Sequence, residues 1–406
     1  MKKFLALILS AVMVLGVAGC GSSSSGEKAE EKTDEVVTEG ISAEDIKVGF
    51  IFIGDENETY TYNHYLGTKA MQEELGISDE QVIIKWNIPE NEESYDAAVD
   101  LAEQGCDIIF ATSFGHEDYI LQAAEEYPDV QFCHATGYQA AMSGLENVHN
   151  YFASIYEARY VAGVVAGMKL AELYGADTDV KIGYVGAFSF AEVKSGYTAY
   201  FLGVRSICPN VTMEVKYTGS WSNQALEKET AEALIADGCV LISQHADTTG
   251  AATASEAAGV YNVGYNASMI EAAPNYALVS SAIIWGSYVT YATECMLNGE
   301  EIAVNWCEGY AKDAVKLTGL NTDVVAPGTE EKIEEVWAGI VDGSIKVFDT
   351  DNWTVGGEKI TSTVDIEGYN GLEYISPDGY FMESELGSAP SFAFVIDGIT
   401  ELNTMY

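Results

Sequence analysis

Aromatic and acidic side chains gather in loops that follow short apolar runs, and their types suit the binding of a small molecule. Loops such as ATSFGHED, GAFSFAEV and QHADTT combine rings or carboxylates with small residues. Aromatic faces stack on planar groups, and carboxylates and amides pair with polar edges. This combination predicts a site for a flat, neutral molecule with polar edges, and a sugar ring would also suit it. The candidate ligand-binding residues are Tyr60, Phe114, Gly115, His116, Phe188, Glu192, Trp221, Asp247, Asn266 and Trp285.

The same loops give little support to catalysis or to metal binding. His116, His134 and His245 all follow apolar runs, so a metal site has to be considered. No second His or Cys stands at metal-binding spacing from any of them. The chain also lacks a GxSxG elbow, a GxxxxGK[ST] loop and a GxGxxG turn after a strand. The residues therefore favour a binding protein over an enzyme, and we predict neither a metal site nor a cofactor.

Short apolar runs alternate with helical patterns through most of the chain, and this alternation would position the loops. The runs are apolar throughout, as is typical of parallel strands that helices cover on both faces. EQGCDIIF and ADGCVLIS each end a helix with Gly and begin a buried strand. We therefore predict an α/β fold with two doubly wound lobes and a ligand cleft at the carboxyl ends of their strands. The predicted strands are 48–53, 82–86, 108–112, 131–134, 181–185, 212–217, 240–244, 260–264 and 278–281, and the predicted helices are 67–75, 95–104, 119–127, 156–173, 196–207, 223–237 and 249–258.

These segments divide the chain into two lobes and an extension. We expect an N-terminal lobe over 46–175 and a C-terminal lobe over 176–281, with part of 282–320 returning to the first lobe. The remaining residues, 321–406, are predicted to form a helix that begins near Pro327 and then an extension rich in Gly and aromatic residues.

The N-terminal segment has the features of a lipoprotein signal. Two lysines precede an apolar run over 4–17, which is shorter than the roughly 20 residues that span a bilayer. Val17-Ala18-Gly19-Cys20 resembles a lipobox, and an acidic, Ser-rich tether follows over 20–45. We expect removal of 1–19 and a lipid on Cys20 that anchors the protein on the outer face of the cell membrane, or in the periplasm of a host with an outer membrane. An ordinary signal peptide with a Cys there by chance is the alternative.

Composition argues against two classes of partner. The chain has 406 residues, and its 63 acidic and 19 basic side chains give a formal net charge of −44. Nucleic acids and anionic lipid surfaces are recognised through clustered Lys and Arg, so neither is an expected partner. We expect the protein to act as a monomer.

Six cysteines follow Cys20, and none of them has CxxC spacing. Cys106 and Cys239 stand where predicted buried strands begin. Small buried thiols fit these places better than disulfides do.

The loops carry a resemblance to a known family. ATSFGHED, FCHATGY, NYFASIYEARYVAGVVAG, GYVGAFSFAEV, FLGVRSICPNV, LISQHADTT and GVYNVGYN run in order through most of the folded chain. This series resembles the basic membrane protein family of lipoprotein substrate-binding components of ABC transporters, and most closely its purine-binding branch. The resemblance implies a type I periplasmic-binding-protein fold, with two lobes joined by hinge strands and no enzymatic activity. It also implies that a purine is captured between the lobes and passed to a permease with its ATPase.

The resemblance also assigns roles to single residues. Nucleoside-binding relatives hold the ribose with an Asp and a Lys, whose places here hold Asn266 and the Ile284-Trp285 pair, so a free base is expected rather than a nucleoside. The purine branch typically has Trp at the place of Tyr60 and Tyr at the place of His116. A nucleoside, or a sensory role for another aromatic molecule, is the alternative. The expected ring sandwich is Tyr60 or Phe114 with Phe188 or Trp221, the expected acceptor of N–H groups is Asp247, and the further polar candidates are Asn266 and Glu192.

Overall fold

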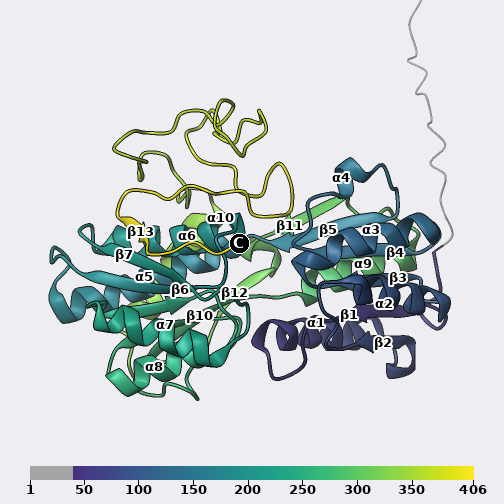
Figure 1. Ribbon diagram of the computed structural model, residues 1–406, viewed down its shortest axis with the longest axis horizontal. Helices are drawn as coiled ribbons and strands as arrows, with labels where there is room; N and C mark the ends of the chain where they lie inside the picture. The colour runs from purple at the N-terminus through teal and green to yellow at the C-terminus, as the bar shows by residue number, and fades with distance from the viewer. Residues whose placement is uncertain (1–39) are drawn as a thin grey trace, which may run out of the picture. The chain divides into compact units, whose positions relative to one another are not determined.

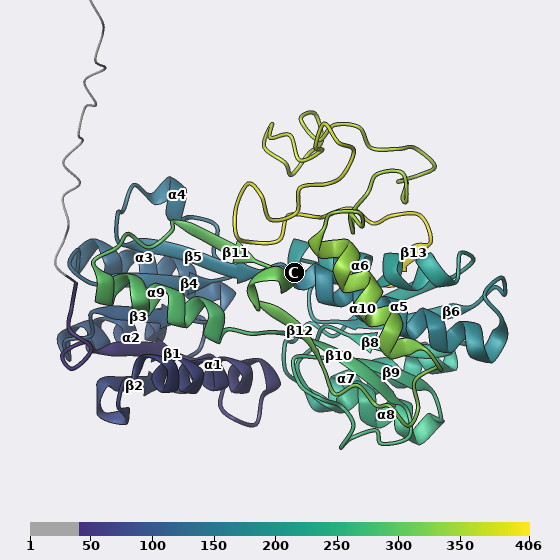
Figure 2. The same cartoon turned by 180° about the vertical axis from the view of Figure 1, so that it is seen from behind.

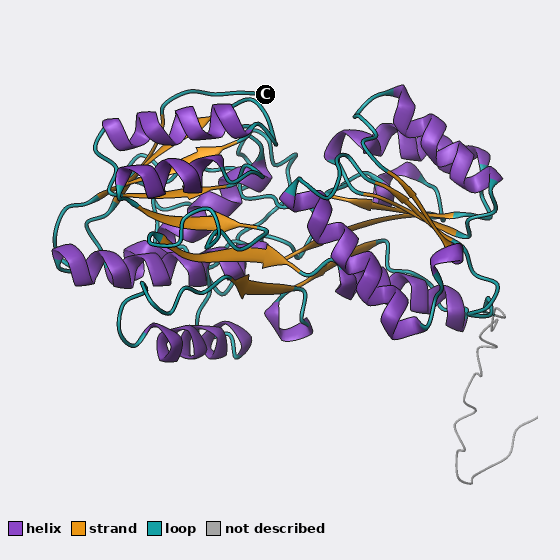
Figure 3. Ribbon diagram, turned by 90° about the horizontal axis from the view of Figure 1, so that it is seen from below, coloured by secondary structure: helices purple, strands orange, loops and turns teal. Residues whose placement is uncertain are grey.

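Two β-sheets, each covered by helices on both faces, build the protein in the computed structural model, which describes residues 40–406 (Figures 1 and 3). These residues belong to one compact unit, Thr38–Tyr406. The predicted signal peptide, Cys20 and the tether up to residue 39 lie outside the described residues. The end of the tether is described, and there the N–H of Ile41 donates to the carbonyl of Met296 at 3.0 Å. The folded chain therefore starts before residue 46, the boundary expected from the sequence.

The N-lobe contains a six-stranded sheet with the order β11-β5-β4-β3-β1-β2, in which all neighbours are parallel. Successive strand residues point to opposite faces, so Phe50 packs with α1 and α9 while Ile51 packs with α2 and α3. The strands are β1 (Val48–Ile51), β2 (Val82–Lys85), β3 (Ile108–Ala111), β4 (Gln131–Ala135), β5 (Val148–Ala153) and β11 (Asn305–Glu308), and the helices are α1 (Thr59–Leu75), α2 (Glu92–Glu103), α3 (Glu117–Glu126), α4 (Ala140–Ser143) and α9 (Gly286–Asn298).

The C-lobe contains a seven-stranded sheet with the order β12-β10-β9-β8-β6-β7-β13. Only β12, at one edge, runs antiparallel to its neighbour in this sheet of the described chain. The strands are β6 (Lys181–Gly186), β7 (Thr212–Tyr217), β8 (Leu241–Gln244), β9 (Tyr261–Tyr265), β10 (Ala277–Ile283), β12 (Val315–Thr318) and β13 (Ile399–Glu401), and the helices are α5 (Ile155–Tyr174), α6 (Ala191–Ile207), α7 (Gln224–Ala236), α8 (Gly250–Ala258) and α10 (Thr329–Val341).

The chain passes between the two lobes three times within residues 40–406. The passages lead from β5 through α5 to β6, from β10 to α9, and from β11 to β12 (Figure 2). The side chain of Asn63 on α1 reaches one passage and donates to the carbonyl of Ile283 at 2.6 Å. This arrangement places the carboxyl ends of both sets of parallel strands toward the region between the lobes.

Every strand predicted from an apolar run is present, whereas β5, β11, β12 and β13 were not predicted. β5 is fully buried, but His149 and Asn150 interrupt its apolar pattern. The first helix was predicted to start at residue 67 and in fact starts at Thr59, because the Glu58 side chain caps it. Among the described residues, no helix is both long enough and apolar enough to cross a bilayer.

The extension after α10 packs on the C-lobe with little regular structure (Figure 1). Rings such as Trp353, Phe381 and Phe392 join the C-lobe core. Glu401 of β13 accepts hydrogen bonds from the hydroxyls of Tyr197, at 3.0 Å, and Tyr217. The extension is therefore part of this lobe.

The six described cysteines are free thiols, and five of them are buried. Cys106 and Cys239 are among the buried ones, as the sequence predicts.

Candidate ligand-binding cleft

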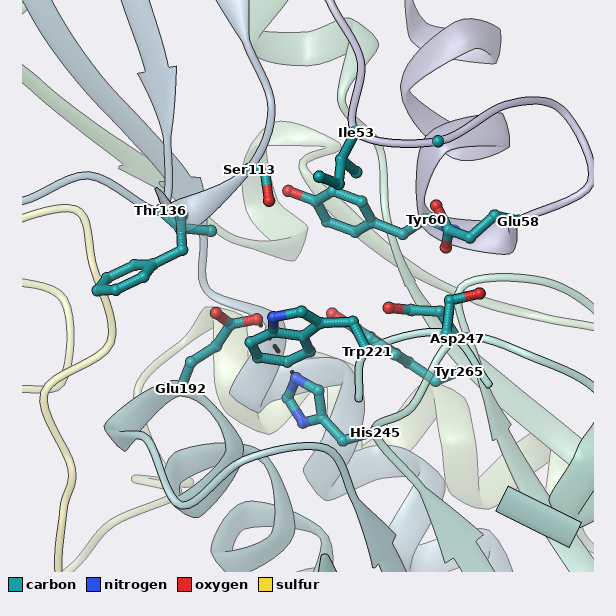
Figure 4. A pocket seen from close by; sticks show the side chains of 13 residues that line it. Ile53, Glu58, Tyr60, Ser113, Thr136, Glu192, Trp221, His245, Asp247 and Tyr265 are labelled. Carbon is teal, nitrogen blue, oxygen red and sulfur yellow. Dashed lines mark hydrogen bonds and ion pairs between the residues drawn. The ribbon is translucent and has the colours of Figure 1, made fainter. Parts of the chain in front are cut away.

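A cavity of about 130 Å³ lies between the lobes, at the carboxyl ends of strands from both sheets (Figure 4). Loops at this edge of parallel sheets are the usual place for ligands. The N-lobe lines the cavity with Ile53, Gly54, Glu58, Tyr60, Ser113, Phe114 and Thr136, and the C-lobe lines it with Glu192, Trp221, Ser222, His245, Asp247 and Tyr265.

The start of α1 brings Tyr60 to the N-lobe wall. The carboxylate of Glu58 accepts hydrogen bonds from the backbone N–H groups of Tyr60 at 2.7 Å and Thr61 at 2.8 Å. Such a cap satisfies donors that the first turn leaves unpaired. The hydroxyl of Tyr60 then donates to the carbonyl of Thr112, just after β3. The ring is thus held at both ends.

A row of stacked rings spans the two lobes beside the cavity. Phe114 of the N-lobe stacks on Phe190 of the C-lobe with centroids 5.6 Å apart. Tyr138 extends the row on the N-lobe side, and Phe188 and Trp221 extend it on the C-lobe side. Phe114 remains 40% exposed. These rings join the lobes by contact, and among them only Phe114 and Trp221 line the cavity.

Asp247, just after β8, connects the lobes and also faces the cavity. Its Oδ1 accepts a hydrogen bond from Nδ2 of Asn266 at 2.8 Å. Its backbone carbonyl accepts from the hydroxyl of Thr59 at 2.7 Å and from the N–H of Thr59 at 3.4 Å. No described residue hydrogen-bonds to the other carboxylate oxygen, so one strong acceptor is left for a ligand.

Burial and neighbouring carboxylates raise the pKa of acidic side chains from both lobes at this place. Burial raises the pKa of Asp247 well above its usual range, and the charges of Glu58 and Glu227 add to the rise. Burial also raises the pKa of Glu58 and brings the pKa of Glu227 to about 7. Taking a charged carboxylate out of water is unfavourable, and a like charge nearby makes it more so. A hydrogen-bond donor on a ligand would relieve this cost.

His245 and Arg159 support the C-lobe wall. Nε2 of His245 lies 3.3 Å from Oε1 of Glu192, and Nδ1 lies 3.4 Å from the hydroxyl of Tyr184. Burial and the charge of Arg159 lower the pKa of His245 to about 4, so the ring is neutral near pH 7. The guanidinium of Arg159 packs over the ring of Tyr265 at 3.7 Å from its centroid, and it does not line the cavity.

The structure brings some of the predicted site residues to the cavity and places others behind it. Tyr60, Phe114, Glu192, Trp221 and Asp247 line the cavity. The predicted residues that do not line it are Gly115, His116, Phe188, Asn266 and Trp285.

The residues behind the cavity have other partners. His116 is buried, with Nε2 3.0 Å from the carbonyl of Ile88, and burial lowers its pKa to about 4. The N–H of Gly115 donates to the Glu90 side chain at 2.8 Å. The ring of Trp285 is almost fully buried and stacks on His64 at 4.0 Å. Trp285 therefore packs behind Tyr60, in the N-lobe core.

Sequence reasoning missed several lining residues. Thr136 and Ser113 are small and follow β4 and β3, so only their place at a strand end could have indicated them. Tyr265 is the last residue of β9 and precedes Asn266, which the sequence predicts as a site residue. His245 was considered only as a metal ligand. Among the described residues, no group of three or more His, Cys, Asp or Glu side chains is arranged to hold a metal ion.

Comparison with known proteins connects this geometry to a family. Residues 46–351 match the family model described as "ABC transporter substrate-binding protein PnrA-like". A purine-binding protein of Brucella abortus is 33% identical over 322 residues, which is 78% of this chain and 89% of the relative. A putative ABC transporter glucose-binding protein of Haloferax volcanii is 36% identical over 249 residues, 59% of this chain and 61% of the relative.

Two solved structures share the fold. A solute-binding protein of an ABC transporter from Conexibacter woesei superposes with a TM-score of 0.61 and is 20% identical, covering 74% of this chain and 98% of its own. A solute-binding protein from Aeropyrum pernix gives a TM-score of 0.60 at 18% identity, covering 75% of this chain and 93% of its own.

Proposed function

The chain belongs to the PnrA-like family of ABC transporter substrate-binding proteins, and from that premise we propose that its cleft captures a free purine base for delivery to the permease. The lobes have the type I periplasmic-binding-protein fold, and family and fold are those of solute-binding proteins. The observation that carries the proposal is the free carboxylate oxygen of Asp247 in a cavity lined by the rings of Tyr60, Trp221 and Tyr265.

A purine has a flat ring for the aromatic side chains of the cleft and N–H donors for its carboxylates. Its flat face stacks on aromatic side chains, at about 1–3 kcal/mol per base. Its ring and exocyclic N–H groups can donate to ionised carboxylates, which have hydrogen-bond acceptors and no donors. The name of the Brucella relative, a purine-binding protein, supports the same ligand class.

A free base suits the cleft better than a nucleoside. Asn266 stands where nucleoside-binding relatives have the Asp that holds the ribose. Its side-chain amide already donates a hydrogen bond to Asp247. The Lys that also holds the ribose in those relatives is replaced here by the Ile284-Trp285 pair, and the ring of Trp285 stacks on His64. No Lys or Arg lines the cavity in the described part of the chain. Ribose hydroxyls would therefore be buried without their usual partners, which is costly.

Titration of ligand-free protein tests this choice. Calorimetry should show adenine, guanine or hypoxanthine binding at least about tenfold more tightly than the matching nucleoside, a difference of ~1.4 kcal/mol. A nucleoside that binds as tightly as its base would contradict the free-base assignment and give Asn266 a role toward ribose.

A sugar is the second candidate, and one observation favours it. The Haloferax relative is named a putative glucose-binding protein, and rings with carboxylates also suit sugar hydroxyls. The same titration therefore includes glucose. Binding of glucose without binding of any purine would replace the proposed ligand class.

We also propose that a lipid on Cys20 anchors the protein outside the cell membrane. The lipobox and the acidic, Ser-rich tether after it support this anchor, and a lipoprotein carries two acyl chains, enough for stable attachment. A Cys20→Ala chain expressed in its host should appear in the medium or remain as uncleaved precursor. Normal processing with retention on the membrane would show that Cys20 is not the anchor.

A further inference from the structure

Apart from His245 and two tyrosines, the ionisable side chains that line the cleft in the described part of the chain are carboxyl groups. Glu58 comes from the N-lobe, and Glu192 and Asp247 come from the C-lobe. His245 also lines the cleft and is held neutral near pH 7 by its burial and by Arg159, which keep its pKa at about 4. In the described part of the chain, no Lys or Arg reaches the lining.

We propose that the cleft selects its ligand by charge state, accepting neutral or cationic heterocycles that present N–H donors to Asp247 and Glu192 and rejecting anionic ones. The inference rests on the proposed function, because it concerns the same cleft, and it adds a rule about which purines can enter.

Two carboxylate oxygens of the cleft have no hydrogen-bond partner among the described residues and are available to a ligand. Both oxygens of Glu58 are occupied by backbone N–H groups at the start of α1. One oxygen of Asp247 is paired with Asn266, and one oxygen of Glu192 lies 3.3 Å from His245. No described residue pairs with the second oxygen of either carboxylate. A ligand edge with two N–H donors would satisfy both oxygens and favour the ionised form of the carboxyls, which burial disfavours. An edge of lone pairs would meet acceptors only when the carboxyls are ionised.

Beside Asp247, no Lys or Arg of the described residues lines the cavity. The guanidinium of Arg159 lies behind the lining, where it packs over Tyr265 and its Nη1 donates to the carbonyl of Gln244 at 2.7 Å, while its Nε and Nη2 have no partner among the described residues. Like charges repel strongly in a partly dry site. The ionisable groups around Asp247 are Glu58, Tyr60, Glu192, Glu227, His245 and Tyr265.

A pair of purines with different acidities tests the proposal. Xanthine loses a ring proton between about pH 6 and pH 9, whereas adenine does not ionise in that range. Since only the neutral fraction would bind, the apparent Kd of xanthine should rise about tenfold for each pH unit above its own pKa. The Kd of adenine, which reports any titration of the protein itself, should change less than about threefold. Urate, an anion at neutral pH, should bind at least about tenfold more weakly than adenine.

Charge-neutral variants locate the discrimination. Glu192→Gln and Asp247→Asn each replace an ionisable carboxyl by a neutral amide at nearly constant volume, and either should reduce the adenine-to-urate preference by at least about threefold. Glu229→Gln on the exposed face of α7 removes a charge away from the cleft and should leave the preference unchanged. Thermal unfolding of each variant checks that it is folded.

The possible outcomes separate the two proposals. Anionic xanthine that binds as tightly as the neutral form would overturn the charge rule and leave the purine assignment standing. No binding of any purine across the pH range would overturn the purine assignment and the charge rule with it.

Discussion

The two lobes contribute differently to the cleft. The C-lobe supplies two carboxylates, Glu192 and Asp247, with an imidazole and two rings. The N-lobe also supplies two rings, Tyr60 and Phe114, but its one carboxylate, Glu58, is occupied as a helix cap. The difference suggests a division of work in which the C-lobe recognises the ligand, and the N-lobe closes over it with Tyr60 and Phe114.

The largest expected effect is a loss of ligand affinity when the C-lobe site is changed, compared with a matched change in the N-lobe. Asp247→Ala removes the free acceptor of the C-lobe and should weaken purine binding by at least about tenfold, or ~1–3 kcal/mol. The matched N-lobe variant, Ser113→Ala, should change affinity less than about threefold, because the Ser113 hydroxyl already donates to Glu90 at 2.6 Å. Calorimetry measures both. Equal losses, with intact thermal transitions, would erase the proposed difference between the lobes.

A smaller effect should appear in the pH dependence of stability. The folded-state pKa of Glu227 is raised to about 7 from 4.5, so the folded protein binds the proton more tightly than the unfolded chain. The stability that this group adds is present at low pH and is lost as pH rises from about 4.5 to about 7. Glu227→Gln should remove this contribution, on the order of a few kcal/mol, and so flatten the profile.

Denaturant unfolding at about pH 5 and pH 8 compares the Glu227→Gln variant with the parent protein. Glu229→Gln, on the exposed side of the same helix, is the control and should keep the parent's slope. An unchanged slope in the Glu227 variant would mean that this carboxyl does not contribute to the pH dependence.

The smallest expected effect concerns the contact between the lobes. Phe114→Leu or Phe190→Leu removes a stacked pair worth about 0.5–1.5 kcal/mol and should weaken ligand binding by about threefold to tenfold. The double variant should cost little more than either single one, because both remove the same contact. Fully additive losses in calorimetry would show that the rings act separately.

Much of the fold followed from the sequence, because continuous apolar runs are a strong signal for strands covered on both faces. The signal failed where polar residues interrupt a buried strand and where a strand lies at the edge of a sheet. β5 carries His149 and Asn150 in a buried strand, and β11 is a half-exposed edge strand with no apolar run. The start of α1 was missed because its first turns contain Tyr60 and Tyr62 rather than helix-forming residues, and the Glu58 cap acts through a single side chain.

The site was harder to predict than the fold. Asp247, Trp221 and Tyr60 have side-chain types that suggest binding, and all three line the cavity. His116 and Trp285 have equally suggestive types but point into the N-lobe core, and no sequence pattern separates these two cases. Ser113 and Thr136 line the cavity through their place alone, which only the three-dimensional arrangement reveals.

The molecule that the protein carries when freshly purified tests the central claim most directly. Denaturation of the protein and mass spectrometry of the released small molecules should identify a purine base in near-stoichiometric amount. A sugar, a nucleoside or an anionic heterocycle in that amount would contradict the account of a carboxylate-lined cleft that holds a neutral base.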